Sequence, residues 1–156
     1  MKKVLFLHGL ESRPGGAKPN LLKKEGYQVF NPHLPKSSFD ESIKIAQDIV
    51  DLESPDVVVG SSRGGAVAMC LNLKGAKLVL IAPAWKHFSS STEKTITEKN
   101  MILHSEHDTV VEWNDSAKLA LASGSDLVTI GKDHRMNDPD AHEGLLDAVK
   151  WVSRDA

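Results

Sequence analysis

A serine between two glycines is the residue whose setting in this chain most favours chemistry. The pentapeptide at residues 60–64 reads GSSRG and places Ser62 between Gly60 and Gly64, directly after the apolar run 57–59. A G-x-S-x-G sequence between a strand and a helix permits the sharp turn that exposes a nucleophilic serine. The first N–H groups of that helix would face negative charge developing on a substrate. Alone, the pentapeptide equally fits a glycine-rich turn that binds phosphate or does nothing.

Two later segments could supply the general base and the orienting acid that a nucleophilic serine requires. Asp108 lies in residues 104–111, HSEHDTVV, and His134 lies in residues 131–137, GKDHRMN. Each segment follows an apolar run, and open α/β sheets bind their ligands where the strands end. Taken singly, Asp108 would be a turn-forming acid and His134 a solvated loop histidine. Together with Ser62, each at a strand exit, they favour catalysis.

Neighbouring residues offer alternatives for each role. Ser61 lacks a glycine two residues before it. Asp133 directly precedes the candidate base, and loop neighbours seldom pair an imidazole ring with a carboxylate. Glu106 is a second candidate acid, and His142 is expected on the surface of the last helix.

The first apolar run, Val4–Leu7, ends in His8-Gly9, and the loop 10–17 follows. Such a loop could aim the backbone N–H of Leu10, together with that of Arg63, at a reacting carbonyl oxygen. The sequence also fits a plain glycine turn that leaves the strand. We expect His8 to be a structural side chain that holds the loop.

These candidates require strands that end at one edge of a sheet. Short apolar runs alternate with segments of helical spacing, and most runs are apolar throughout, as in parallel strands covered on both faces. The pattern predicts a three-layer α/β/α sandwich of about six mostly parallel strands. The expected strands are 4–7, 28–31, 57–59, 77–81, 101–104 and 127–130, and the expected helices are 19–25, 38–54, 64–73, 113–122 and 138–154.

Several residues mark the ends of these helices. Pro19 and Pro139 suit first turns, Ser38 and Glu41 form a capping box, and Gly26 and Gly124 suit C-terminal caps. The Ser- and Thr-rich stretch 87–99 breaks the alternation and is expected to be a loop or a short polar helix.

Composition excludes several classes of protein. A chain of 156 residues is the length of one domain, so we expect a single domain over 1–156. The net charge of −2 argues against a basic nucleic-acid binder, and the single cysteine, Cys70, excludes a disulfide framework. The apolar runs, of which Leu78–Ala82 is one of the longest, are too short to span a bilayer. We therefore expect a cytoplasmic protein without nucleic-acid or membrane partners, as a monomer or small homo-oligomer.

In combination, the motifs resemble an α/β-hydrolase-fold serine hydrolase. The resemblance rests on His8-Gly9, the pentapeptide 60–64, the segment 104–111 and Asp133-His134, in the family's order of nucleophile, acid and base. The stretch LFLHGLESRPGGAK resembles, more narrowly, small bacterial esterases that lack a lid. The family implies eight strands; here the first predicted strand already carries His-Gly, so a minimal fold of about six strands without a cap domain is expected.

The resemblance also implies a mechanism and a site. Ser62 would be the nucleophile, His134 the general base and then acid, and Asp108 the group that orients His134. Leu10 and Arg63 would supply the oxyanion hole, and no cofactor or metal is implied. The expected activity is cleavage of small acyl (carboxylic) esters through an acyl-enzyme, with thioesters or amides as alternative substrates.

Two alternative functions belong to other classes of protein. His104, His107, Asp108, His134 and Asp138 could form a hydrolytic metal site, which would leave the serine motif unexplained. Alternatively, the chain could be a non-catalytic α/β module in which residues 60–65 hold a phosphate or small ligand. No P-loop lysine follows, which disfavours a nucleotide.

Substrate preference has weaker signals. Arg13 and Arg63 flank the proposed oxyanion loop and nucleophile, and either favour an anionic substrate or are surface residues. Trp85, Phe88 and Trp113 follow strands and could line an acyl pocket or pack at its rim. The missing lid favours a short, water-soluble substrate.

Overall fold

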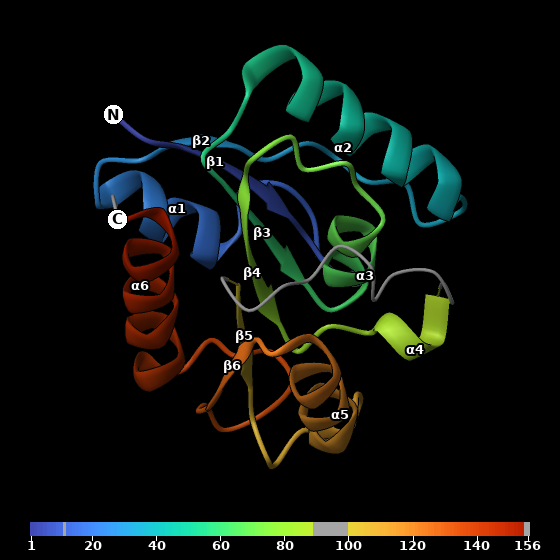
Figure 1. Cartoon of the computed structure of the whole chain (residues 1–156), viewed down its shortest axis with the longest axis vertical. Helices are drawn as coiled ribbons and strands as arrows, with labels where there is room; N and C mark the ends of the chain where they lie inside the picture. The colour runs from blue at the N-terminus through green and yellow to red at the C-terminus, as the bar shows by residue number, and fades with distance from the viewer. Residues whose placement is uncertain (11, 89–99, 155–156) are drawn as a thin grey trace.

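Six strands pair in one sheet in the computed structural model, which describes residues 1–10, 12–88 and 100–154 (Figure 1). Their order is β2-β1-β3-β4-β5-β6, and every neighbouring pair is parallel. The parallel six-stranded sheet confirms the predicted class. The strands are β1 (Lys3–Leu7), β2 (Gln28–Phe30), β3 (Val57–Ser61), β4 (Lys77–Ile81), β5 (Met101–His104) and β6 (Asp126–Thr129).

Helices cover both faces of this sheet and give the three expected layers (Figure 1). On one face the packed helices are α1 (Ala17–Lys24) and α6 (Pro139–Ser153). On the other face they are α2 (Phe39–Glu53), α3 (Arg63–Met69) and α5 (Trp113–Ser123). The short helix α4 (Trp85–Phe88) follows β4. The described residues contain no cap domain, and none of their helices is long and apolar enough to cross a membrane.

The central strands β1, β3, β4 and β5 are largely apolar because each face of the sheet has its own core. Side chains of a strand alternate between the two faces. In β1, Val4 and Phe6 pack with α1 and α6, whereas Leu5 and Leu7 pack with α2 and α3. All four are buried. Polar alternation is therefore missing because no face of this strand meets water.

The helix ends follow the predicted signals at most positions. The Ser38 hydroxyl accepts a hydrogen bond from the backbone N–H of Glu41, and the Asp138 carboxylate accepts one from the N–H of Ala141. Gly26 and Gly124, which follow α1 and α5, have φ of 100° and 77°. These are left-handed conformations that glycine adopts without strain.

The prediction that α3 continues to Leu73 is wrong, because the helix ends at Met69. The Gln47 side chain on α2 forms hydrogen bonds with the segment that follows α3. Its Oε1 accepts from the N–H of Asn72 at 2.8 Å, and its Nε2 donates to the carbonyl of Asn72 at 3.0 Å. A tertiary contact thus takes both backbone groups that a longer helix would have used. The predicted loop or helix at 87–99 lies mostly outside the described residues.

Glycines allow α3 to approach the sheet closely. A Cβ at Gly60 would lie 2.5 Å from the carbonyl oxygen of Gly64, and one at Gly64 would overlap the carbonyl of Leu7. Real Cβ atoms do not come so close to backbone oxygens. Both glycines of the pentapeptide are therefore required by packing between β1, β3 and α3.

We predict that Gly64→Ala lowers the free energy of unfolding by about 3 kcal/mol or more, because backbone must move to admit the methyl group. Chemical denaturation measures the change. Gly16→Ala is the matched control, since a Cβ there would have no atom closer than 3.9 Å, and it should cost less than about 1 kcal/mol. Equal stability of the two variants would contradict the packing argument.

Candidate active site

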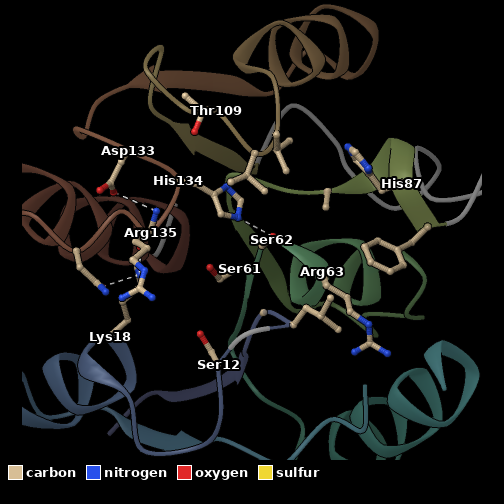
Figure 2. Close-up of a pocket in the computed structure, with 17 residues that line it drawn as sticks. Ser12, Lys18, Ser61, Ser62, Arg63, His87, Thr109, Asp133, His134 and Arg135 are labelled. Atoms are coloured by element: carbon tan, nitrogen blue, oxygen red, sulfur yellow. Dashed lines mark hydrogen bonds between the residues drawn. The ribbon is translucent and has the colours of Figure 1, made fainter. Parts of the chain in front are cut away.

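Ser62 occupies a strained turn between β3 and α3. Its backbone φ of 54° and ψ of −115° lie in a region that residues other than glycine rarely adopt. Backbone hydrogen bonds hold the turn: the Ser62 N–H donates to the carbonyl of Ile81, and the Ser62 carbonyl accepts from Gly65, Ala66 and Ala84. The turn presents the hydroxyl to a pocket at the carboxyl edge of the sheet (Figure 2).

The structure brings together the three residues predicted for nucleophile, base and acid. His134 Nε2 lies 2.9 Å from Ser62 Oγ, and His134 Nδ1 lies 2.7 Å from Asp108 Oδ2. An ionised carboxylate only accepts, so Nδ1 carries the proton and Nε2 accepts from the serine hydroxyl. Figure 2 shows His134 reaching from its loop to Ser62. This arrangement can remove the proton of Ser62 as the oxygen attacks an electrophile.

The Asp108 carboxylate is fully buried and fully hydrogen-bonded. Its Oδ1 accepts from the N–H groups of Val110 at 2.7 Å and Val111 at 2.8 Å. Burial alone would raise the pKa of Asp108, but the hydrogen bond from His134 and those from Val111 and Val110 outweigh burial and lower it. The acid is therefore ionised at neutral pH.

His104, which the sequence indicated only as a possible metal ligand, is a hydrogen-bond partner of Asp108. It ends β5, is fully buried, and its Nε2 lies 2.9 Å from Asp108 Oδ2 and 3.0 Å from the carbonyl of Val111. Both partners only accept, so Nε2 carries the proton. Its Nδ1 lies 2.6 Å from the Ser116 hydroxyl. The sequence feature that could have indicated this contact is the position of His104 at the end of a predicted strand, four residues before Asp108.

His8 is hydrogen-bonded to the loop after β1 and to the backbone of Leu34. The N–H of Leu34 donates to His8 Nε2, so His8 is protonated on Nδ1 and donates to the carbonyl of Gly9 at 2.8 Å. Burial lowers the pKa of His8, which favours this neutral form. The Gly9 carbonyl also accepts from Ser12. Because the peptide is planar and trans, the N–H of Leu10 faces away from both donors.

Leu10 and Arg63 both line the pocket beside Ser62. A Cβ at Gly9 would lie 3.3 Å from the Cβ of Ser62, so the loop that follows β1 lies against the serine. Arg63 is the first residue of α3, where a backbone N–H has no acceptor within the helix. The two residues expected to supply backbone donors thus line the same pocket as Ser62.

The arginine side chains do not lie as an anion site at Ser62 would require. The Arg63 guanidinium donates to the carbonyl of Pro35 at 2.9 Å and lies 5.6 and 5.7 Å from the ring centroids of Phe39 and Phe88. Arg63 is only 2% exposed. Arg13 is exposed and does not line the pocket. The two arginines are therefore a structural clamp and a surface residue.

The residues considered as alternatives to Ser62, Asp108 and His134 make other contacts or lie at exposed positions. Ser61 lines the pocket, and Asp133 Oδ1 accepts from the backbone N–H groups of Arg135 and Met136. Glu106 is exposed, and His142 lies on α6 with its Nε2 3.3 Å from Asn137 Oδ1.

Among the aromatic candidates, Phe88 alone lines the described pocket. The indole N–H of Trp85 donates to the carbonyl of Asp115, and that of Trp113 donates to the Thr129 hydroxyl. The two tryptophans therefore pack away from the serine.

The residues of the metal alternative do not converge. His104 and His134 are each hydrogen-bonded to Asp108, whereas His107 is exposed and Asp138 caps α6. Among residues 1–10, 12–88 and 100–154, no three or more His, Cys, Asp or Glu side chains could together hold a metal ion.

Comparison with solved structures defines the class of fold. A monoacylglycerol lipase from Paleococcus ferrophilus (TM-score 0.77, 15% identity) covers 97% of this chain, which covers 93% of it. An esterase domain from Rhodothermus marinus (TM-score 0.73, 18% identity) covers 97%, with 87% of that chain covered. A CIB-like hydrolase from Thermoplasma acidophilum (TM-score 0.77, 20% identity) also covers 97%, with 86% of that chain covered. At these identities the likeness shows the fold, which is that of the α/β hydrolases.

Within that fold class the chain has a particular family. The family model described as Uncharacterised protein family (UPF0227) matches residues 3–100, and the chain belongs to this family. The match includes Ser62 and ends before Asp108 and His134. A search of curated protein sequences finds no match.

We predict that His104→Leu lowers the free energy of unfolding by about 1–3 kcal/mol, because Ser116 and Asp108 each lose a buried partner. His104→Gln offers a side-chain N–H in place of Nε2 and should recover part of this loss. His107→Leu, at an exposed position of the same segment, is the control. Denaturant titration measures all three, and a neutral His104→Leu would contradict the hydrogen bonding described above.

We also predict a pH dependence for the contribution of Asp108. Its pKa is lower in the folded protein, so its charge stabilises the fold above the unfolded value of about 4, and this stabilisation is lost as the pH falls through the folded pKa. The difference in unfolding free energy between wild type and Asp108→Asn should be largest near neutral pH and shrink below about pH 4. A constant difference down to pH 3 would contradict the lowered pKa.

Proposed function

We propose that this protein is a serine hydrolase that cleaves small carboxylic esters through a Ser62–His134–Asp108 triad. The observation that carries the proposal is the continuous hydrogen-bonded path from Ser62 Oγ through His134 to the buried Asp108 carboxylate. Each link has the length and direction that general-base catalysis needs. The strained Ser62 turn and the helix N-terminus behind it add support.

In the first half of the reaction, Ser62 Oγ bonds to the acyl carbon while its proton passes to His134 Nε2. The carbonyl oxygen becomes an oxyanion, which the N–H groups of Leu10 and Arg63 would stabilise. His8 and Gly9 hold the Leu10 peptide for this role, and Gly60 and Gly64 hold the Arg63 peptide. His134 then protonates the leaving oxygen as its bond to carbon breaks, and an acyl-enzyme remains.

In the second half, water gives a proton to His134 and bonds to the acyl carbon. Collapse of this oxyanion breaks the bond to Ser62, which regains its proton from His134, and the acid product leaves. Asp108 stays ionised throughout and stabilises the imidazolium. The same steps would serve thioesters or amides, which a panel with one acyl group and three leaving atoms distinguishes.

The pocket supports a small acyl substrate. Its volume is about 670 Å³, and the described residues place no cap domain over it. Ala84, Phe88, Val110 and Val111 offer an apolar wall. We further propose that residues 1–156 act as one domain in the cytoplasm, as a monomer or small homo-oligomer.

We predict that Ser62→Ala lowers kcat/KM for 4-nitrophenyl butyrate by about 10⁴-fold or more. A fluorophosphonate probe should label the wild type at Ser62, located by mass spectrometry of the peptides, and should not label Ser62→Ala. Ser61→Ala is the matched control, since its hydroxyl is one residue away, and it should keep both labelling and turnover. A wild type that neither reacts with the probe nor cleaves the ester would instead indicate a non-catalytic binding module.

A further inference from the structure

The pocket around Ser62 has two chemically different halves. One half is apolar and is lined by Leu10, Ala84, Phe88, Val110 and Val111. The other half is polar and includes Ser12, Lys18, Asp133, Arg135 and Asn137. In Figure 2, Lys18, Arg135 and Asp133 lie on one side of Ser62, and Arg63 and His87 lie on the other. The polar half has no part in the mechanism above.

Lys18 in this half is a buried cation whose hydrogen-bond acceptors within the described residues are all uncharged. It lies in the first turn of α1 and is 8% exposed. Its Nζ donates to the carbonyl of Arg135 at 2.6 Å and to Asn137 Oδ1 at 2.9 Å, both uncharged acceptors. Within the described residues it forms no ion pair, and its third proton has no acceptor.

Such an ammonium is costly to keep charged. The pKa of Lys18 is lowered to about 8, chiefly by burial and to a lesser extent by the positive charge of Arg135, while Asp133 and Asp138 oppose this lowering. A buried charge is normally paired, and removing its partner destabilises the charged form. Because Lys18 lines the pocket, an anion bound there could supply the missing partner.

Arg135 adds a second cation at the same place. Its side chain is exposed, lines the pocket, and forms no hydrogen bond or ion pair with the described residues through its guanidinium. Asp133, the acid of this half, uses Oδ1 to accept from the backbone of Arg135 and Met136 and pairs with neither cation. A planar guanidinium beside an ammonium suits a carboxylate or phosphate.

We propose that Lys18 and Arg135 form a subsite for an anionic group, a carboxylate or phosphate, of the substrate. The proposal rests on the proposed function and names its substrate class: an ester with a small apolar part for one half of the pocket and an anionic part for the other. Since residues 133–137 carry both Arg135 and His134, the anion binds on the loop that holds the base.

The test compares butyrate esters of three phenols that differ only in the group at position 3: a carboxylate, a neutral carboxamide of similar size, and a phosphate. We expect kcat/KM of the wild type to favour the carboxylate or the phosphate ester over the carboxamide by about tenfold or more, which corresponds to about 1.4 kcal/mol. Which anionic ester is favoured identifies the group. Arg135→Gln, which keeps the carbonyl that Lys18 contacts, should reduce the preference several-fold, and Lys18→Met should do the same.

The matched control is Arg13→Gln, which removes a positive charge at an exposed position outside the pocket and should leave the preference unchanged. Ser62→Ala separates binding from chemistry: by calorimetry it should bind the anionic ester at least about tenfold more tightly than the carboxamide. A wild type that cleaves all three esters equally well, or an Arg135→Gln variant with the full preference, overturns the subsite and leaves the hydrolase intact. Preferential binding by Ser62→Ala without turnover by the wild type supports the subsite and overturns the proposed function.

Discussion

The buried carboxylate of Asp108 is the group on which the geometry of the site depends. It accepts four hydrogen bonds, from the backbone of Val110 and Val111 and from the imidazoles of His104 and His134. A buried negative charge is tolerated only when such donors replace water. The donors in turn acquire fixed positions. Oδ2 orients His134 toward Ser62, and His104 ties the same oxygen to β5 and, through Ser116, to α5.

The other side of the site depends on close backbone packing rather than on charge. Gly60 and Gly64 let the start of α3 lie against β1 and β3, where any larger residue would overlap backbone atoms. This proximity places Ser62 beside the loop that His8 holds. The positions of Ser62 and of the proposed oxyanion donors therefore depend on the absence of side chains, and those of His134 and Asp108 on a buried charge.

The sequence predicts the features that are local or periodic. Residue types and spacing predict the strands that are buried on both faces and the Ser38 cap. They also single out Ser62, Asp108 and His134, in that order, as candidate site residues. It misses features that depend on tertiary partners. Gln47 ends α3 early through a contact with a residue 25 positions away. His104 has the features of an ordinary strand residue in the sequence, and only the folded chain shows its hydrogen bond with Asp108. Lys18 resembles any helix lysine in the sequence, because its partners Arg135 and Asn137 follow more than a hundred residues later.

The contact of Lys18 with the carbonyl of Arg135 has a mechanical consequence. Helix α1 contributes no residue to the proposed triad, yet Lys18 in its first turn is hydrogen-bonded to the loop that carries His134. The helix has eight residues, and Leu22 is its buried apolar anchor in the sheet core. If α1 detached while the sheet stayed folded, the loop would lose this hydrogen bond. Catalytic competence would then depend on the local opening of one short helix rather than on global unfolding.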